Sequence, residues 1–316
     1  MIKKHVHFLM CPFTGLGMYN GFRGNRWLRN RIKIFKQFVV PSLLAQTSQD
    51  FILWVSWRYE EKYNKQVIEL KKYLDETGLR NVFTYGGVCF YDDKHEDNVA
   101  RNRLVENLHA SMPDLINVIG EADYVYLTIQ PSDDVYYKRF VADIAEGFEE
   151  DNDIDALGFT RGYIMNYRAG QIKEWNPVTN PPFYTIKFKR EDFLDPIKHC
   201  EFTSIKKDVG KYKAGTPIPS HEYVGDALKY KRSDYRGFLV GTHLDNISTV
   251  FKHPYAGNDV SKKVLEDFGL ENVPLLKVKF SFRKKILKAL PYKVQRKLRY
   301  IFGEKLFNKI YEFLRN

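Results

Sequence analysis

The chain has 316 residues, of which 44% are hydrophobic and 15% aromatic, and a formal net charge of +11. This length allows one large α/β domain or two smaller ones. The three cysteines, Cys11, Cys89 and Cys200, form no CxxC pair, which argues against a disulfide framework and a structural zinc site. No stretch approaches the roughly 18 apolar residues of a membrane span, and the N-terminus does not resemble a signal peptide. We therefore expect a cytoplasmic protein.

The positive charge belongs to the C-terminal end of the sequence. Residues 277–316 carry 13 Lys and Arg against two acidic residues, so residues 1–276 carry 37 of each sign and are neutral. Because a nucleic-acid-binding fold is usually basic itself, we expect no nucleic-acid partner. The charge pattern divides the chain into a domain over 1–276 and a basic tail over 277–316.

The first half of the sequence alternates between strand and helix patterns. Strands are predicted at 6–11, 50–57, 81–85 and 122–129. Helices are predicted at 30–45, 64–77 and 97–108. Pro41 is expected to kink or restart the first helix, and Gly78 to end the second. This alternation predicts a largely parallel sheet with helices on both faces.

The second half has a different pattern. After a segment of helical pattern at 135–148, β-type runs follow at 156–160, 163–167 and 183–188, with the turn-rich NPVTNPP between the last two. A later run at 238–242 ends at His243. These short runs predict a mixed or antiparallel extension of the same sheet.

Two carboxylates follow the predicted strand at 122–129. This strand stops at Pro131, and Asp133 and Asp134 come directly after it. Ligands bind just beyond the carboxyl ends of strands in α/β sheets. Paired carboxylates there suit a divalent cation that also holds substrate phosphates. A solvated Ser-Asp-Asp turn or a helix N-cap that includes Ser132 is the alternative, and both interpretations stay open.

Other polar residues are candidates for the same site. Arg101 and Asn102 open the helix that precedes the acidic pair, and a planar guanidinium suits phosphate oxygens. The alternative for Arg101 is a surface ion pair with an acid such as Asp97. His243, at a strand end, can complete a metal site or bind a phosphate, and Asn246 can contact a ligand. A structural histidine and a helix cap are the alternatives for these two.

A carboxylate for acid–base chemistry lies near a predicted helix start. Glu222 follows Ser220, the expected N-cap, and can act as a general base that deprotonates an acceptor hydroxyl. A first-turn Glu favoured by the helix dipole is the alternative. Asp226 is a second candidate base. The sequence contains no nucleophile elbow, no HExxH motif and no set of kinase motifs. Hydrolase and zinc-protease interpretations therefore lack support.

The order of these features resembles a GT-A glycosyltransferase, the nucleotide-sugar-dependent type with one Rossmann-like domain. PSDD at 131–134 resembles the DxD site, and NVARNRLVENL at 98–108 resembles a helix start common in family-2-like enzymes. RNRIKIFKQFVVPSLLAQTSQDFILWVSW at 29–57, which contains PSLLAQT at 41–47, and GTHLDNIST at 241–249 are similar to a bacterial rhamnosyltransferase group. The resemblance covers roughly residues 1–250.

This sequence departs from the family pattern at two positions. Pro131 stands where the DxD pattern has its first acid, which reduces the set of metal ligands. Trp57 stands where many relatives carry a small or acidic residue that meets the nucleotide base.

The resemblance implies transfer of a sugar from a UDP- or dTDP-linked donor to a glycan or lipid-linked glycan in cell-surface polysaccharide synthesis. It implies that Mn²⁺ or Mg²⁺ neutralises the leaving diphosphate, with Asp133, Asp134 and His243 as ligands. The donor-binding residues that it implies are Arg101, Asn102, Ser132, Asp133 and Asn246. An inverting reaction would use Glu222 or Asp226 as base. The alternatives are a non-catalytic sugar-nucleotide or glycan-binding relative, and a membrane-binding or nucleic-acid-binding adaptor.

The tail has the pattern of two basic amphipathic helices. They span 280–290 and 292–314 and are separated by Pro291. An apolar stripe among Lys and Arg is typical of an interfacial helix on an anionic membrane. A helix pair that packs on the domain or on a partner is the alternative. Because a lipid-linked acceptor would lie at the membrane, we expect a peripheral protein at the inner face of the plasma membrane.

Overall fold

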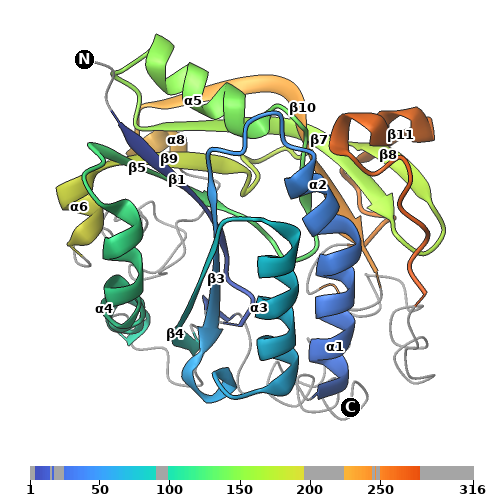
Figure 1. The fold of residues 1–316 in the computed structure, drawn as a ribbon. Helices are drawn as coiled ribbons and strands as arrows, with labels where there is room; N and C mark the ends of the chain where they lie inside the picture. Colours follow the sequence, from blue (N-terminus) through green and yellow to red (C-terminus); the bar gives the residue numbers. More distant parts are fainter. Residues whose placement is uncertain are drawn as a thin grey trace, which may run out of the picture.

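The computed structural model describes residues 4–14, 16–17, 25–89, 99–195, 224–243, 246 and 250–277. These residues form an 11-stranded sheet with helices packed against it (Figure 1). The predicted fold class, a mixed α/β domain consistent with a Rossmann-like GT-A fold, is confirmed.

The parallel part of the sheet contains the four strands predicted in the first half. They are β1 (His5–Cys11), β3 (Ile52–Arg58), β4 (Asn81–Cys89) and β5 (Tyr124–Ile129). The strands lie in the order β5-β1-β3-β4, and the short β2 (Leu16–Gly17) pairs with β4. In the centre, Phe8 is paired with Ile52 of β3 and with Leu127 of β5.

The strand order reverses at β1. The chain runs from β1 outward to β3 and β4, and then returns to the other side of β1 as β5. In open α/β sheets such a switch point leaves a crevice at the carboxyl ends of the two strands, where ligands bind. The acidic pair follows β5 and therefore lies at this switch point.

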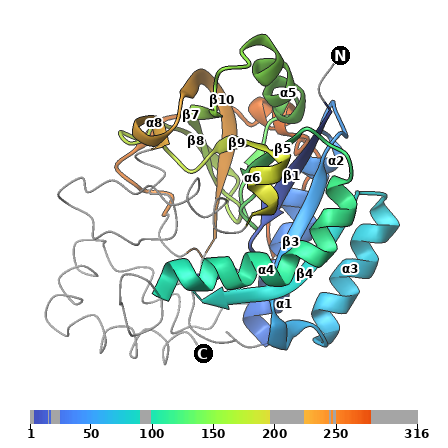
Figure 2. The ribbon, with the colours of Figure 1, turned by 90° about the vertical axis from the view of Figure 1, so that its left-hand side faces the viewer.

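Alternating side chains of the central strands enter two separate cores. On one face, Leu9 and Leu53 pack in a core with α1 (Asn25–Ile34) and α3 (Lys65–Thr77). On the other face, Phe8 and Trp54 pack with α4 (Val99–Ile119) and α6 (Arg190–Leu194). Figure 2 views the sheet from the side that α4 covers. The prediction of helices on both faces is confirmed.

The first two helices show how local sequence determines helix ends. The helix predicted at 30–45 begins earlier, as α1, and continues through a π-helical turn, η1 (Phe35–Val39), into α2 (Val40–Leu44). Pro41 lies in the first turn of α2, and the backbone stays right-handed helical at Val39 and Val40, so the helix runs on past the proline. In α3, the side chain of Asn64 accepts a hydrogen bond from the Gln66 amide, and Gly78, at φ +78°, ends the helix as predicted.

The second half extends the sheet with mainly antiparallel pairs, as predicted. β9 (Tyr184–Lys189) is antiparallel to β5 and to β7 (Ala156–Asn166), and β8 (Gln171–Trp175) is antiparallel to β7. β10 (Tyr230–Thr242) is parallel to β7, and the short β11 (Ala256–Asp259) pairs with β8 at the edge.

The predictions for this half were wrong in detail. The runs at 156–160 and 163–167 form the single strand β7, because Gly162 interrupts the hydrophobic pattern without interrupting the pairing. The strand β8 was not predicted, because its polar side chains obscure the alternation of hydrophobic and polar residues that marks a strand. The segment at 135–148 begins with β6 (Val135–Tyr136), which pairs with β10, before α5 (Phe140–Glu150) starts. Pairing with a distant strand overrides the local helical pattern there.

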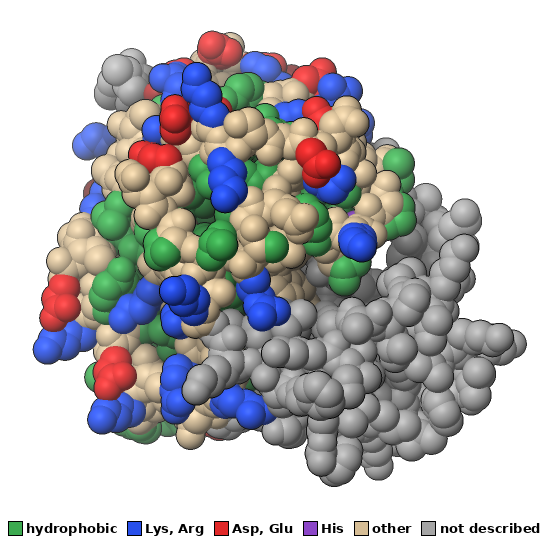
Figure 3. Space-filling view, turned by 90° about the vertical axis from the view of Figure 1, so that its right-hand side faces the viewer, with side chains coloured by type: hydrophobic (Ala, Val, Ile, Leu, Met, Phe, Trp, Pro, Cys, Tyr) green, Lys and Arg blue, Asp and Glu red, His purple; other side chains and the backbone are tan. Residues whose placement is uncertain are grey.

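The elements at the end of the described chain are short. They are α8 (Val224–Ala227) and the 3₁₀ helix η4 (Lys262–Phe268). The predicted tail helices lie outside the described residues, which end at Lys277. Among the described helices, none combines the length and apolar character needed to cross a bilayer. Figure 3 shows Lys and Arg side chains interspersed with Asp and Glu on the described part of one face.

Candidate active site at the carboxyl ends of β1 and β5

The backbone of the acidic turn after β5 is held from two sides. The buried amide of Gln130 donates to the carbonyl oxygens of Pro131, at 2.9 Å, and Asp134, at 2.8 Å. From the end of β7, the Tyr167 hydroxyl donates to the carbonyl oxygen of Asp133 at 2.8 Å. These bonds close the turn and fix the direction in which both aspartate side chains leave the backbone.

The carboxylate of Asp133 is the centre of a cluster drawn from three segments. Its Oδ2 lies 2.5 Å from Nη1 of Arg31, 2.9 Å from Nε2 of His243 and 3.2 Å from Nδ2 of Asn246. Asn246 also donates to the carbonyl oxygen of Gly241 at 2.7 Å and accepts from the amide of His243. Asn246 therefore ties the backbone at Gly241 and His243 next to Asp133.

Arg31 is a site residue that the sequence analysis missed. It projects from α1 and is 5% exposed, and its guanidinium lies over the ring of Trp27 at 5.6 Å from the centroid. A signal for it exists in the sequence, because Arg31 falls on the apolar stripe that contains Leu28, Ile32 and Phe35, three residues after Leu28. A basic residue on a buried helix face needs a buried partner of opposite charge.

The two neighbouring aspartates have opposite electrostatic environments. Burial raises the pKa of the Asp133 carboxyl, but the charge of Arg31 and the hydrogen bond from His243 outweigh burial and hold that pKa well below its usual value. Burial and then the charge of Asp133 raise the pKa of Asp134 well above its usual value. Asp134 accepts the Gly241 amide at 2.9 Å through Oδ1. Within the pair, the pKa is therefore lowered at Asp133 and raised at Asp134.

Backbone and side-chain atoms pack closely around Gly241, next to the Asp133 cluster. A Cβ on Gly241 would overlap the carbonyl oxygen of Asp133 and the ring of Tyr167. That ring stacks on Phe38 of η1, with ring centroids 3.6 Å apart. The ends of β5, β7 and β10 and the π-helical turn therefore meet here without space for one additional methyl group.

The structure brings four of the predicted site residues together. Asp133, Asp134, His243 and Asn246 are adjacent, and Ser132 is half-buried in the same turn. The remaining predictions lie at positions whose side chains the structure does not describe. These are Arg101 and Asn102 in α4, Asp226 in α8, and Glu222, which lies outside the described residues altogether.

The arrangement around Asp133 does not fit a divalent cation. Oδ2 already faces three nitrogen donors, one of them a guanidinium. Asp134 is directed to the Gly241 amide. Within the described part of the chain, no group of three or more His, Cys, Asp or Glu side chains is arranged to hold a metal ion. The Mn²⁺ or Mg²⁺ that the resemblance implies stays a prediction from sequence.

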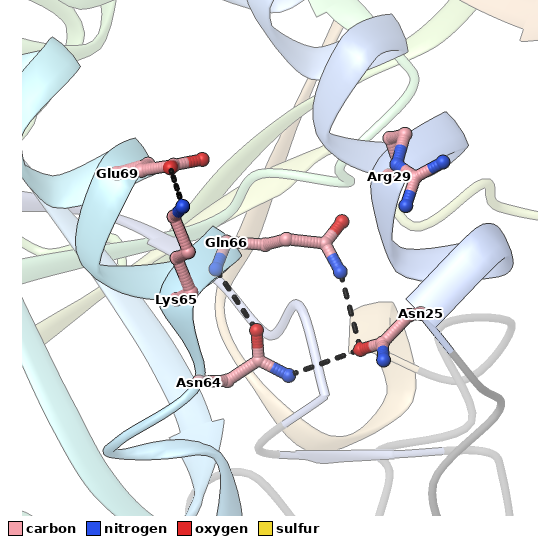
Figure 4. A pocket seen from close by; sticks show the side chains of 6 residues that line it. All are labelled: Asn25, Arg29, Asn64, Lys65, Gln66 and Glu69. Atoms are coloured by element: carbon pink, nitrogen blue, oxygen red, sulfur yellow. Dashed lines mark hydrogen bonds and ion pairs between the residues drawn. The ribbon is translucent and has the colours of Figure 1, made fainter.

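A separate polar hollow lies between the N-terminal ends of α1 and α3 (Figure 4). It has a volume of about 470 Å³ and is lined by Asn25, Arg29, Asn64, Lys65, Gln66 and Glu69. Its amide groups bond to one another: Gln66 donates to Asn25 at 3.2 Å, and Asn64 does so at 3.5 Å. None of the predicted site residues lines this hollow, and we place the candidate site at Asp133.

Comparisons with known proteins place few limits on this site. The chain matches no known family model and no curated protein. A solved structure of TarS from S. aureus is similar over 93% of this chain, at 13% sequence identity and a TM-score of 0.38. The chain spans half the length of that structure. A likeness of this degree carries no weight for the activity of this chain.

Proposed function

We propose that this chain is a glycosyltransferase that moves a sugar from a nucleoside-diphosphate donor to a glycan acceptor. The observation that carries the proposal is the Asp133 cluster at the switch point between β1 and β5. Arg31, Asp133 and His243 each lie in or next to a segment on which the resemblance rests, and those segments are far apart in the sequence. Their convergence where an α/β sheet binds ligands supports a shared role.

The chemistry of the cluster suits an anionic donor. Arg31 brings a charge that does not depend on pH, and its N–H groups match phosphate oxygens. When the bond between the anomeric carbon and the diphosphate breaks, negative charge develops on the leaving oxygen. Donors fixed in a dry site stabilise such charge without reorganisation. We assign the diphosphate to this cluster, with UDP or dTDP as the nucleotide, and propose Ser132, Arg101 and Asn102 as further donor contacts.

The acceptor step requires a base if the reaction inverts configuration. The acceptor hydroxyl oxygen forms a bond to the anomeric carbon, the diphosphate leaves with the electron pair of the broken bond, and the hydroxyl proton passes to a carboxylate. We propose Glu222 for this carboxylate, with Asp226 as the second candidate. A general base acts when it lies within about 3 Å of the proton that it removes.

The charge distribution supports a proposal for the location of the protein. We propose a glycan or lipid-linked glycan of the cell surface as acceptor. The 13 basic residues of 277–316 would hold the protein at the anionic inner face of the plasma membrane. The neutral body, with charges of both signs interspersed, supports a small-molecule donor over a nucleic acid.

The experiment that tests the proposal is a thermal-shift panel on the full chain with UDP, dTDP, GDP and CMP, followed by a donor-turnover assay. A ligand that binds the native state raises the melting temperature by mass action. We expect a shift with UDP or dTDP, and release of that nucleotide from its sugar conjugate. A shift without release would identify a non-catalytic binder. No shift with any nucleotide would contradict the proposal in favour of an adaptor.

A further inference from the structure

We propose that Arg31 is the fixed cation of this site, so that the protein binds a nucleoside diphosphate without a divalent metal. This inference rests on the proposed function and specifies how the donor is held. In an acid-centred donor site, a metal bridges the carboxylates and the diphosphate. In this protein the guanidinium of Arg31 lies where such a metal would meet the carboxylate, with Nη1 2.5 Å from Oδ2 of Asp133.

The hydrogen-bond chemistry of the cluster leaves little room for a metal at Oδ2. Nε2 of His243 lies 2.9 Å from Oδ2, and Nη1 of Arg31 lies 2.5 Å from Oδ2 and 3.5 Å from that same nitrogen, so the three groups already engage one another. The orientation of the Asn246 amide follows from its partners, because its nitrogen faces two acceptors while its oxygen faces the His243 amide.

The position of Arg31 is determined by the fold and does not depend on a bound ligand. The side chain is 5% exposed and packs against Trp27, and α1 continues directly into the π-helical turn that supports Tyr167. Its charge is permanent, whereas a bound cation depends on the metal concentration.

An arginine in this place also has an electrostatic purpose. Asp133 is half-buried, and an isolated carboxylate charge beside a diphosphate would repel it. Arg31 neutralises that carboxylate at close range, and in a site of low dielectric such a contact outweighs more distant charges. Buried ion pairs are costly, and replacing them by hydrophobic residues is often neutral or stabilising. Recognition of a ligand therefore explains this pair, at the ligand-binding edge of the sheet, better than stability does.

The primary test uses the wild-type full chain. Thermal shifts with UDP and with dTDP are measured in EDTA and in Mn²⁺, and electron paramagnetic resonance measures whether Mn²⁺ binds in the nucleotide complex. We expect the same shift in EDTA as in Mn²⁺, and no stoichiometric Mn²⁺. A shift that requires Mn²⁺, with bound Mn²⁺ that Asp133→Asn removes, would overturn this inference and leave the proposed function standing. No shift under either condition would overturn both.

Variants on one helix test the role of Arg31 itself. Arg31→Gln removes the charge, and we expect nucleotide affinity to fall about tenfold or more, as for the loss of a charge-assisted hydrogen bond. Arg31→Lys keeps the charge without the planar fork and should retain part of the affinity. Arg29→Gln makes the same change at an exposed position of α1 and should bind as wild type. Wild-type affinity in a folded Arg31→Gln protein would overturn the inference. If Arg31→Gln does not fold, the comparison of EDTA with Mn²⁺ on the wild-type chain decides.

Discussion

Asp133 and His243 are 110 residues apart in the sequence, and a hydrogen bond of 2.9 Å joins their side chains. Each follows a strand, one after β5 and the other after β10, and the sheet brings both strand ends to the same edge. Arg31 reaches the same carboxylate oxygen from α1.

The first prediction concerns the stability of the buried ion pair. Asp133→Asn leaves the guanidinium of Arg31 buried without an opposite charge, and we expect the free energy of unfolding to fall by about 3–5 kcal/mol. Asp75→Asn makes the same change in an exposed i,i+4 pair with Lys71 on α3, and should cost about 0.3–0.5 kcal/mol. Urea denaturation of both variants measures the difference. Equal losses would show that the cluster does not behave as a buried pair.

The second prediction concerns the close packing at Gly241. In Gly241→Ala the new methyl group overlaps the Asp133 carbonyl and the Tyr167 ring, so the backbone must move. We expect a loss of about 3 kcal/mol and weaker nucleotide binding. Gly78→Ala is the control, since its φ of +78° is strained for alanine while its Cβ meets nothing within 4 Å. That variant should lose about 1 kcal/mol and keep its binding.

The third prediction concerns pH. His7 is buried in β1 and bonds to Thr128 at 2.8 Å, and burial, with the nearby His5, lowers its pKa from 6.5 to about 3. Between these two values the unfolded chain binds a proton that the native protein does not, so stability falls as the pH falls from 6.5 toward 3. A tenfold change in a protonation equilibrium corresponds to about 1.4 kcal/mol, so the loss of stability has an upper limit on the order of 5 kcal/mol.

His7→Met is the variant that tests this pH effect, because methionine does not titrate. We expect its melting temperature to fall less than that of the wild type over the same pH range. His253→Met is the comparison, since His253 is only partly buried and burial lowers its pKa. The change of slope should be smaller there. Parallel pH profiles for wild type and His7→Met would contradict the prediction.

The fourth prediction separates the base from the donor site. Glu222→Gln should reduce sugar transfer by about 10²–10⁴-fold, because the acceptor proton loses its carboxylate. The thermal shift with UDP or dTDP should be unchanged, because we propose the Asp133 cluster, and not Glu222, as the place where the donor binds. Asp226→Asn is measured in parallel. If both variants transfer sugar at the wild-type rate, neither carboxylate is the base.

The fifth prediction concerns the basic tail. The full chain should co-sediment with vesicles that contain phosphatidylglycerol, and added salt should weaken binding because it screens the charges. A double variant, Lys284→Glu with Lys285→Glu, should weaken binding, at about 1 kcal/mol for each lysine removed. The matched control places the same two changes at Lys71 and Lys72 of α3. Equal loss in both double variants would contradict a specific role for the tail.

Local sequence patterns predicted much of the first half of the fold. The strands at β1, β3 and β5 and the helix α3 could be predicted because each is long and strongly patterned, and because Asn64 and Gly78 mark the ends of α3. The second half was less predictable. β8 forms by pairing with β7, and β6 forms by pairing with β10. Pairing with a distant strand produces only a weak hydrophobic pattern in a short segment, so neither strand could be predicted from its own residues.

The candidate site shows the same division. The sequence by itself determined the α/β class, the neutral body with its basic tail, and the acidic pair beyond a strand end, because these depend on periodicity and on composition. Only the tertiary structure decided that Asp133 pairs with Arg31, His243 and Asn246, and that Asp134 turns to the Gly241 amide. The physical reason is that a contact between distant segments depends on strand order and helix placement, which no local pattern encodes.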